Sequence, residues 1–154
     1  MALQKNTTAP DFTLPSTSGE DFILSEHKGK PLVLFFYPKD FSPVCTKEAC
    51  TFRDQFEAFR DLEVTVLGIS RDDLETHHRF RDKHNLPFHL LADKSGKVSR
   101  LYKAQLPIVG MSSRVTYVLD GDHTIRLVID GMAALVDAEP HIKKSLEELR
   151  AVKK

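Results

Sequence analysis

The chain has 154 residues, a length that suits one domain with a buried core, and we expect residues 1–154 to form a single domain. Its 22 basic and 22 acidic side chains balance, so the overall charge favours neither nucleic acid nor an anionic membrane as a partner. No stretch approaches the roughly 20 apolar residues of a membrane span, and the first residues lack the apolar core of a secretion signal. We therefore expect a cytoplasmic protein that binds neither nucleic acid nor membranes.

The first part of the chain predicts a hairpin, a buried strand and a helix. Residues 12–24 place apolar residues on both sides of the turn-forming sequence PSTSGE, which indicates a small hairpin. Residues 31–37 are a continuous apolar run, typical of a strand that is buried on both faces. Residues 43–60 then change to helical spacing, because one stripe holds Phe52, Phe56 and Phe59.

The second part continues the alternation of strands and helices. The expected elements are a buried strand at 64–70, a polar helix at 72–85, a strand at 88–93, a short helix within 94–104, a hairpin over 114–130 that turns at Asp120 and Gly121, and a last helix that starts at Pro140 and carries Ile142, Leu146 and Leu149 on one face. This order predicts an α/β fold with a central mixed β-sheet flanked by helices, in which the crossovers form the parallel part.

The two cysteines, Cys45 and Cys50, lie where the buried strand gives way to the helix. Ser42 suits the helix N-cap and Pro43 suits the first helical position, so Cys45 falls at the third. Unpaired N–H groups and the positive end of the helix dipole favour a thiolate there. A basic side chain could add to this effect, and the candidates are Lys39, Lys47, Arg53, Arg100, Arg114 and Arg126. The alternative is that Cys45 is a buried, inert thiol.

Cys50 lies five residues further along the same predicted helix. Such positions are about 8–9 Å apart between Cα atoms and about 140° apart around the helix axis. A disulfide rarely tolerates a Cα separation above about 7 Å. A Cys45–Cys50 disulfide would therefore require the first turns to unwind, which would make the pair a conformational switch. The alternative is that Cys50 occupies a core position beside Phe52 and Phe56.

Other chemistries have weaker support in the sequence. Zinc needs about four ligands, and the histidine-rich stretch, which holds His77, His78, His84 and His89, includes a helix that looks solvated. The chain carries no phosphate-binding glycine loop, no Gly-x-Ser-x-Gly and no His-Glu-x-x-His. We therefore predict no metal and no cofactor.

The segment FFYPKDFSPVCTKEACTFRD resembles the active-site segment of a peroxiredoxin of the Q-type, or bacterioferritin-comigratory-protein, branch. The family motif Pro-x-x-x-Thr/Ser-x-x-Cys corresponds to Pro38, Ser42 and Cys45. The resemblance extends to residues 9–40 and 114–125, and so covers nearly the whole chain. This sequence has Ser42 where threonine is commoner, and Val44 where glycine is commoner.

This resemblance implies a thioredoxin-like fold and a peroxidase that reduces hydrogen peroxide and organic hydroperoxides. It makes Cys45 the peroxidatic cysteine and Cys50 the resolving one, with an intramolecular disulfide that thioredoxin or a similar dithiol reduces. It also implies that Arg114 holds the thiolate and the peroxide oxygens, Ser42 supplies a hydroxyl hydrogen bond, Pro38 shields the site from water, and Glu48 orients the arginine. Members of this branch are often monomers, so we expect a monomer rather than a dimer.

Two other functions use the same residues. A general thiol–disulfide oxidoreductase would apply Cys45 and Cys50 to protein disulfides, although their spacing is wider than Cys-x-x-Cys. A non-catalytic binding module would hold both cysteines in its core. Reactivity toward peroxide tests the peroxidase, reduction of insulin tests the oxidoreductase, and alkylation of the thiols under native conditions tests the binding module.

Overall fold

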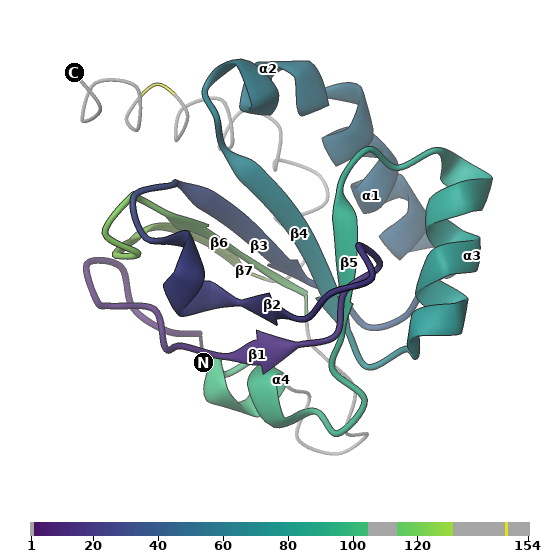
Figure 1. The fold of residues 1–154 in the computed structure, drawn as a ribbon, viewed down its shortest axis with the longest axis horizontal. Helices are drawn as coiled ribbons and strands as arrows, with labels where there is room; N and C mark the ends of the chain where they lie inside the picture. Colours follow the sequence, from purple (N-terminus) through teal and green to yellow (C-terminus); the bar gives the residue numbers. More distant parts are fainter. Residues whose placement is uncertain (1, 105–113, 131–146, 148–154) are drawn as a thin grey trace.

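The computed structural model describes residues 2–104, 114–130 and 147, without the side chains of Val44 and Glu48. Within these ranges a five-stranded sheet, in the order β5-β4-β3-β6-β7, lies beside a two-stranded sheet, β1-β2 (Figure 1). In chain order the elements are β1 (Thr13–Leu14), β2 (Phe22–Ile23), the 3-10 helix η1 (Leu24–His27), β3 (Leu32–Phe36), α1 (Pro43–Asp54), α2 (Phe56–Asp61), β4 (Thr65–Ser70), α3 (Leu74–His84), β5 (His89–Ala92), α4 (Lys97–Leu101), β6 (Val115–Leu119) and β7 (Ile125–Asp130).

The central strand β3 joins the two halves of the larger sheet. It pairs in parallel with β4, which pairs in parallel with β5, and it pairs antiparallel with β6, which pairs antiparallel with β7. All five residues of β3 are buried, as its continuous apolar run predicts. The prediction of a mixed sheet with a parallel part and an antiparallel hairpin is thus confirmed, as is the N-terminal hairpin, which forms β1 and β2.

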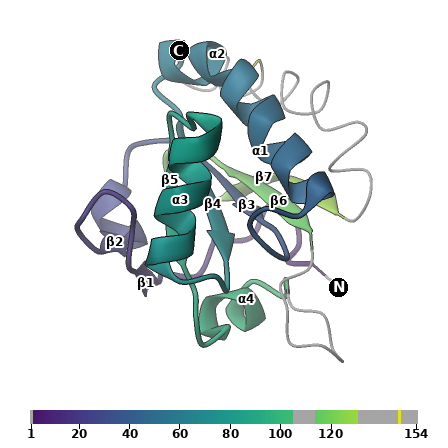
Figure 2. The ribbon, with the colours of Figure 1, turned by 90° about the vertical axis from the view of Figure 1, so that its right-hand side faces the viewer.

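Alternate residues of β3 serve two apolar clusters, one on each face of the sheet. Val33 and Phe35 join the cluster beneath α1, α2 and α3, where the Phe35 ring stacks on Phe52 at 4.6 Å. Leu34 and its neighbours on the other face pack with β1, β2 and α4. Figure 2 shows α1 on one side of the sheet and the β1-β2 hairpin on the other. The helix that carries the cysteines therefore rests directly on the strand that leads into it.

The helix predicted over residues 43–60 is divided at Gln55. This residue caps the end of α1, with ψ near 4°, and the chain starts again as α2 at Phe56. The change of direction buries Phe59 completely within 6.1 Å of the Phe52 ring, while Phe56 stays at the edge of the cluster. Packing against the sheet therefore overrides the helical periodicity of the sequence.

Two further predictions need correction. The helix α3, expected to be solvated, buries His77 and Phe80 completely on its inner side. The β6-β7 hairpin forms as predicted, but its connection is longer than a two-residue turn. Asp120 Oδ1 accepts the backbone N–H groups of Asp122 and Thr124, and this side chain holds the longer loop.

The predicted C-terminal helix from Pro140, with Ile142, Leu146 and Leu149, lies outside the described residues. The expectation of a single domain over residues 1–154 therefore stays a prediction. Among the residues that the structure describes, no helix is long and apolar enough to cross a membrane.

Candidate active site

The candidate site lies beyond the C-terminal end of the central strand β3. The loop from Tyr37 to Ser42 leads from this end into α1. Because β6 runs antiparallel to β3 and Val115 pairs with Phe36, Arg114 lies at the same end of these strands. The sheet register thus brings an arginine 69 residues away in the sequence next to the start of α1.

Cys45 lies in the first turn of α1, in the position that the capping pattern predicts. Ser42 is the N-cap with an extended backbone, Pro43 is the first helical residue, and the Cys45 N–H donates to Ser42 Oγ at 3.3 Å. The Cys45 side chain is 1% exposed and packs in the cluster with Phe35 and Phe52. The thiol is therefore buried, yet it lies where a helix start favours negative charge.

Arg114 supplies the cation beside this thiol. Its Nη2 donates to Cys45 Sγ at 3.3 Å, and a charged donor at this distance stabilises negative charge on the sulfur. The other candidate cations are bound or directed elsewhere: Arg53 to His84 O, Arg100 to Ser95 O and Arg126 to Asp120, with Lys39 and Lys47 exposed. Spacing alone left Arg114 as one of six candidates and the family resemblance singled it out; the fold places it beside the Cys45 sulfur.

The remaining predicted residues are placed as follows. The Ser42 hydroxyl accepts from the Cys45 N–H and donates to Lys39 O at 3.2 Å, so both of these bonds are to backbone groups. Pro38 is half-buried at the start of the loop. The Glu48 side chain lies outside the described part of the structure. The catalytic roles of these three residues stay predictions.

Cys50 lies within α1 in a different setting. Its side chain is half-buried, and its Sγ lies 3.9 Å from Nδ1 of His84, the last residue of α3. Both cysteines are free thiols, and α1 is continuous from Pro43 to Asp54. The structure is thus of the reduced, helical form, in which the helix geometry keeps the two sulfurs apart.

A buried hydrogen-bond network holds the loop between β3 and α1. The Tyr37 hydroxyl donates to Asp40 Oδ1, and His77 Nδ1 lies 2.6 Å from Asp40 Oδ2. The Asp40 N–H donates to Asp72 Oδ2 at 2.9 Å. Burial, with the negative charge of Asp40 beside it, raises the pKa of Tyr37 well above its usual value, so this hydroxyl stays a neutral donor.

Sequence reasoning did not find this network. A usable signal was the spacing of Leu74, His77, Phe80 and His84, which falls on one helical face of an otherwise polar helix. The candidate ligand atoms of Asp40, Asp72 and His77 lie within 4.8 Å of one another, which is close enough for a shared metal ion. Each of the three residues already has hydrogen-bond partners within the network, and Ser70 Oγ also donates to Asp72. These contacts explain why the three side chains lie together: they anchor the loop.

The loop also contains a strained residue, Phe41, with φ of 67°. Its ring packs edge-on against Phe80 at 5.1 Å, and the ammonium of Lys83 lies 5.8 Å from the ring centre. The anchored loop and this contact fix the direction in which α1 begins.

The buried thiol at a helix start, the arginine that faces it and the mixed sheet together define a thiol-dependent oxidoreductase of thioredoxin-like fold. Residues 6–128 match the AhpC/TSA family. Peroxiredoxin Q, chloroplastic, of Sedum lineare is 41% identical over 150 residues, which cover 97% of this chain and 79% of that protein. The crystal structure of peroxidoxin BcpB from Mycobacterium tuberculosis is similar with a TM-score of 0.84 and 33% identity, and the match covers 99% of each chain.

A third similar protein is the bacterioferritin comigratory protein of Xanthomonas campestris, for which alkyl peroxide reduction activity is described. Its structure has a TM-score of 0.78 and 26% identity, and the match covers 93% of this chain and 92% of that one. The chain belongs to the AhpC/TSA family, in the peroxiredoxin Q or Bcp branch, and is a thiol-dependent peroxidase.

Proposed function

We propose that Cys45 is the peroxidatic cysteine. The observation that carries this assignment is the 3.3 Å contact between Arg114 Nη2 and the buried Cys45 Sγ at the start of α1. The Cys45 thiolate attacks one peroxide oxygen, the O–O bond breaks, and the sulfur becomes a sulfenic acid. The departing oxygen takes up a proton and leaves as water or as an alcohol.

The residues around Cys45 support this step in different ways. Arg114 holds the thiolate and the negative charge that develops on the peroxide oxygens. Ser42 caps the turn that carries Cys45, and its hydroxyl is close enough to the Cys45 backbone to help place a bound peroxide. Pro38 limits the access of water, and Glu48 orients the arginine; these two roles rest on the family motif.

We propose that Cys50 resolves the sulfenic acid. Its sulfur attacks Cys45 sulfur, a disulfide forms, and the oxygen leaves as water. Because both cysteines belong to one continuous helix, this step requires the first turns of α1 to unwind. Thioredoxin or a similar dithiol then restores both thiols by exchange.

We propose hydrogen peroxide and organic hydroperoxides as substrates, the latter supported by the alkyl peroxide reduction described for the Xanthomonas campestris protein. We also propose a monomer of one domain over residues 1–154 that binds neither nucleic acid nor membranes. The balanced charge of the chain supports this proposal. A cytoplasmic location suits two thiols that must be kept reduced between turnovers.

Mass spectrometry after one equivalent of hydrogen peroxide tests the assignment. The parent protein should lose two mass units and give a peptide linked through Cys45 and Cys50. Cys45→Ser should consume peroxide much more slowly than the parent. Cys50→Ser should react once with peroxide and stop as a sulfenic acid that dimedone traps. Fast peroxide consumption by Cys45→Ser would overturn the assignment.

The same samples test the alternative of a general disulfide oxidoreductase. That activity predicts reduction of insulin by the reduced protein at a rate that does not depend on peroxide. We expect insulin reduction to be slow, because the Cys45 sulfur is buried and cannot reach a protein disulfide without unwinding.

A further inference from the structure

His84 is placed to act on the sulfur of Cys50. Its Nδ1 lies 3.9 Å from Cys50 Sγ, and both side chains are half-buried. The imidazole packs edge-on against Phe80, with 5.2 Å between ring centres, and lies 6.4 Å from the Phe41 ring. Aromatic neighbours thus hold the ring from its own helix and from the loop before α1.

A second contact fixes the distance between the helices that carry the two groups. Arg53 Nη1, from the last turn of α1, donates to the backbone oxygen of His84 at 2.7 Å. Arg53 lies one helical turn after Cys50, so the end of α3 is tied to α1 next to the thiol. The approach of His84 to Cys50 therefore depends on a main-chain contact as well as on a side-chain rotamer.

Cys50 differs from Cys45 in how its proton can leave. Cys50 is the eighth residue of α1, counted from Pro43, and so lies beyond the unpaired N–H groups of the helix start. The guanidinium of Arg114 is bonded to the other sulfur. A thiol must become a thiolate to attack sulfur, and a neutral imidazole is a suitable acceptor for its proton.

We propose that His84 is the general base of the resolving step, an inference that rests on the proposed role of Cys50. With its proton on Nε2, neutral His84 accepts the Cys50 proton at Nδ1. The Cys50 sulfur forms the bond to Cys45 sulfur, and the S–O bond of the sulfenic acid breaks. The leaving hydroxide takes one proton, from the imidazolium or through water, so the step yields a disulfide and one water.

The contact exists while α1 is helical, which sets the order of events. The proton moves to His84 in the folded helix, and the thiolate is ready when the turns around Cys45 open. Among the described residues, Arg53 of α1 donates to the His84 backbone oxygen, and Arg81, Asp82 and Lys83 are its charged neighbours along α3. The Arg81 guanidinium donates to Phe88 O, and the Lys83 ammonium lies over the Phe41 ring. These side chains are present in parent and variant alike, so a change in pH profile reports on His84 itself.

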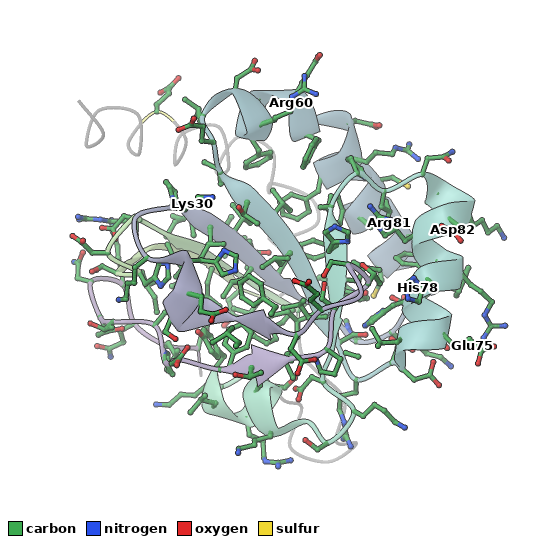
Figure 3. The ribbon with its side chains drawn as sticks, in the orientation of Figure 1. Lys30, Arg60, Glu75, His78, Arg81 and Asp82 are labelled. Atoms are coloured by element: carbon green, nitrogen blue, oxygen red, sulfur yellow. The ribbon has the colours of Figure 1, made fainter. Side chains whose placement is uncertain are left out.

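The experiment compares His84→Asn with the parent and with His78→Asn. His78 lies on the same helix and is exposed, so it is a matched control for a histidine lost from α3 (Figure 3). Reduced protein is mixed with one equivalent of hydrogen peroxide, quenched with dimedone at intervals and analysed by mass spectrometry. The quantities measured are the rate of Cys45–Cys50 disulfide formation and the amount of trapped sulfenic acid.

We expect His84→Asn to form the disulfide at least about tenfold more slowly than the parent and to accumulate sulfenic acid at Cys45. His78→Asn should match the parent. In the parent, the pH profile of disulfide formation should contain a step that is missing in His84→Asn. If His84 only stabilised the packing of α1, the substitution would have the opposite effect. The helix α1 would unwind more easily, and the disulfide would form faster than in the parent.

Two results would overturn the inference, and they are distinguishable. If the parent forms the disulfide and His84→Asn forms it equally fast with the same pH profile, His84 is not the base and the role of Cys50 stands. If the parent forms no Cys45–Cys50 disulfide at all, the resolving role of Cys50 fails and the role of His84 fails with it.

Discussion

The two thiols of α1 lie in opposite settings. Cys45 is buried in the first turn, where the helix start and Arg114 act on its sulfur. Cys50 is half-exposed within the helix, and its neighbour is the imidazole of His84. The first setting offers fixed positive charge, and the second offers access and a group that can accept a proton. One helix thus holds its two thiols in different environments, because the turns that carry them face different parts of the fold.

The comparison also bears on how burial affects reactivity. In the proposed assignment a small peroxide reacts at Cys45 and needs little space there, and fixed donors in a site that excludes water are more effective than the same donors in solution. A protein reductant, in contrast, must reach a sulfur at the surface. Exposure and activation are therefore separate properties, and α1 assigns them to different cysteines.

The largest expected effect is that of replacing Arg114. Arg114→Gln keeps a polar side chain but removes the charge beside Cys45, and we expect the rate constant for peroxide to fall by about 100-fold. Stopped-flow measurement of the first turnover checks this value. Arg126→Gln is the control, since Arg126 binds Asp120 in the loop between β6 and β7 and should keep the parent rate. Equal rates for Arg114→Gln and the parent would show that the charge of Arg114 does not activate Cys45.

The next effect concerns access. A bulky maleimide should label Cys50 at least about tenfold faster than Cys45 in the folded protein, because Cys45 is 1% exposed. Hydrogen peroxide should show the reverse order and oxidise Cys45 first. Peptide mapping after brief treatment with each reagent measures both preferences. Labelling of Cys45 first by both reagents would show that activation outweighs burial.

A smaller effect is expected at the helix start. Ser42→Ala removes the acceptor for the Cys45 N–H and should lower the free energy of unfolding by about 1 kcal/mol. Ser42→Thr keeps a hydroxyl cap and should stay close to the parent. Urea denaturation gives the two values. If alanine and threonine have the same stability, the cap does not hold the turn of Cys45.

The smallest effect lies outside α1. It tests whether the loss of stability at low pH arises in α1 or elsewhere in the fold. Burial, and then the nearby Arg81 cation, lower the pKa of His89 from its usual value of 6.5. The unfolded chain therefore takes up this proton first as the pH falls. The resulting stability is complete above about pH 6.5 and is lost as the pH falls below it, and solvent screening keeps the effect small for this partly exposed ring.

His89→Asn should flatten the stability profile between about pH 7 and 5, as measured by urea denaturation at each pH. The asparagine keeps a polar group near Thr17 Oγ1, which lies 3.0 Å from His89 Nδ1. If the dependence of stability on pH is unchanged in this variant, other groups cause the loss of stability in acid. His27 is one of them, because burial lowers its pKa also.

The local features of the site could be predicted from the sequence, because they depend on neighbouring residues. Ser42 and Pro43 start a helix in the same way in many folds, so the position of Cys45 follows from counting. The mixed sheet follows from the order of apolar runs. The motif around Pro38, Ser42 and Cys45 was specific enough to indicate the family.

Features that depend on the register of the sheet could not be predicted in this way. Arg114 reaches Cys45 because Val115 pairs with Phe36; sequence spacing left six candidate cations, and only the family resemblance pointed to Arg114. The burial of His77 depends on Asp40, 37 residues away, which gives it a partner inside the protein. The polar composition of α3 therefore suggested a solvated helix, although its inner side is part of the core.

The break at Gln55 has a consequence for the redox cycle. Helix formation is cooperative, so an uninterrupted helix over residues 43–60 would propagate fraying from Cys45 toward Phe59. The cap at Gln55 ends that cooperative unit, and Phe59 is held against the sheet by a separate helix, α2. The proposed redox cycle therefore needs only the turns of α1 to rearrange while α2 stays folded, and Gln55 marks the limit of that local unfolding.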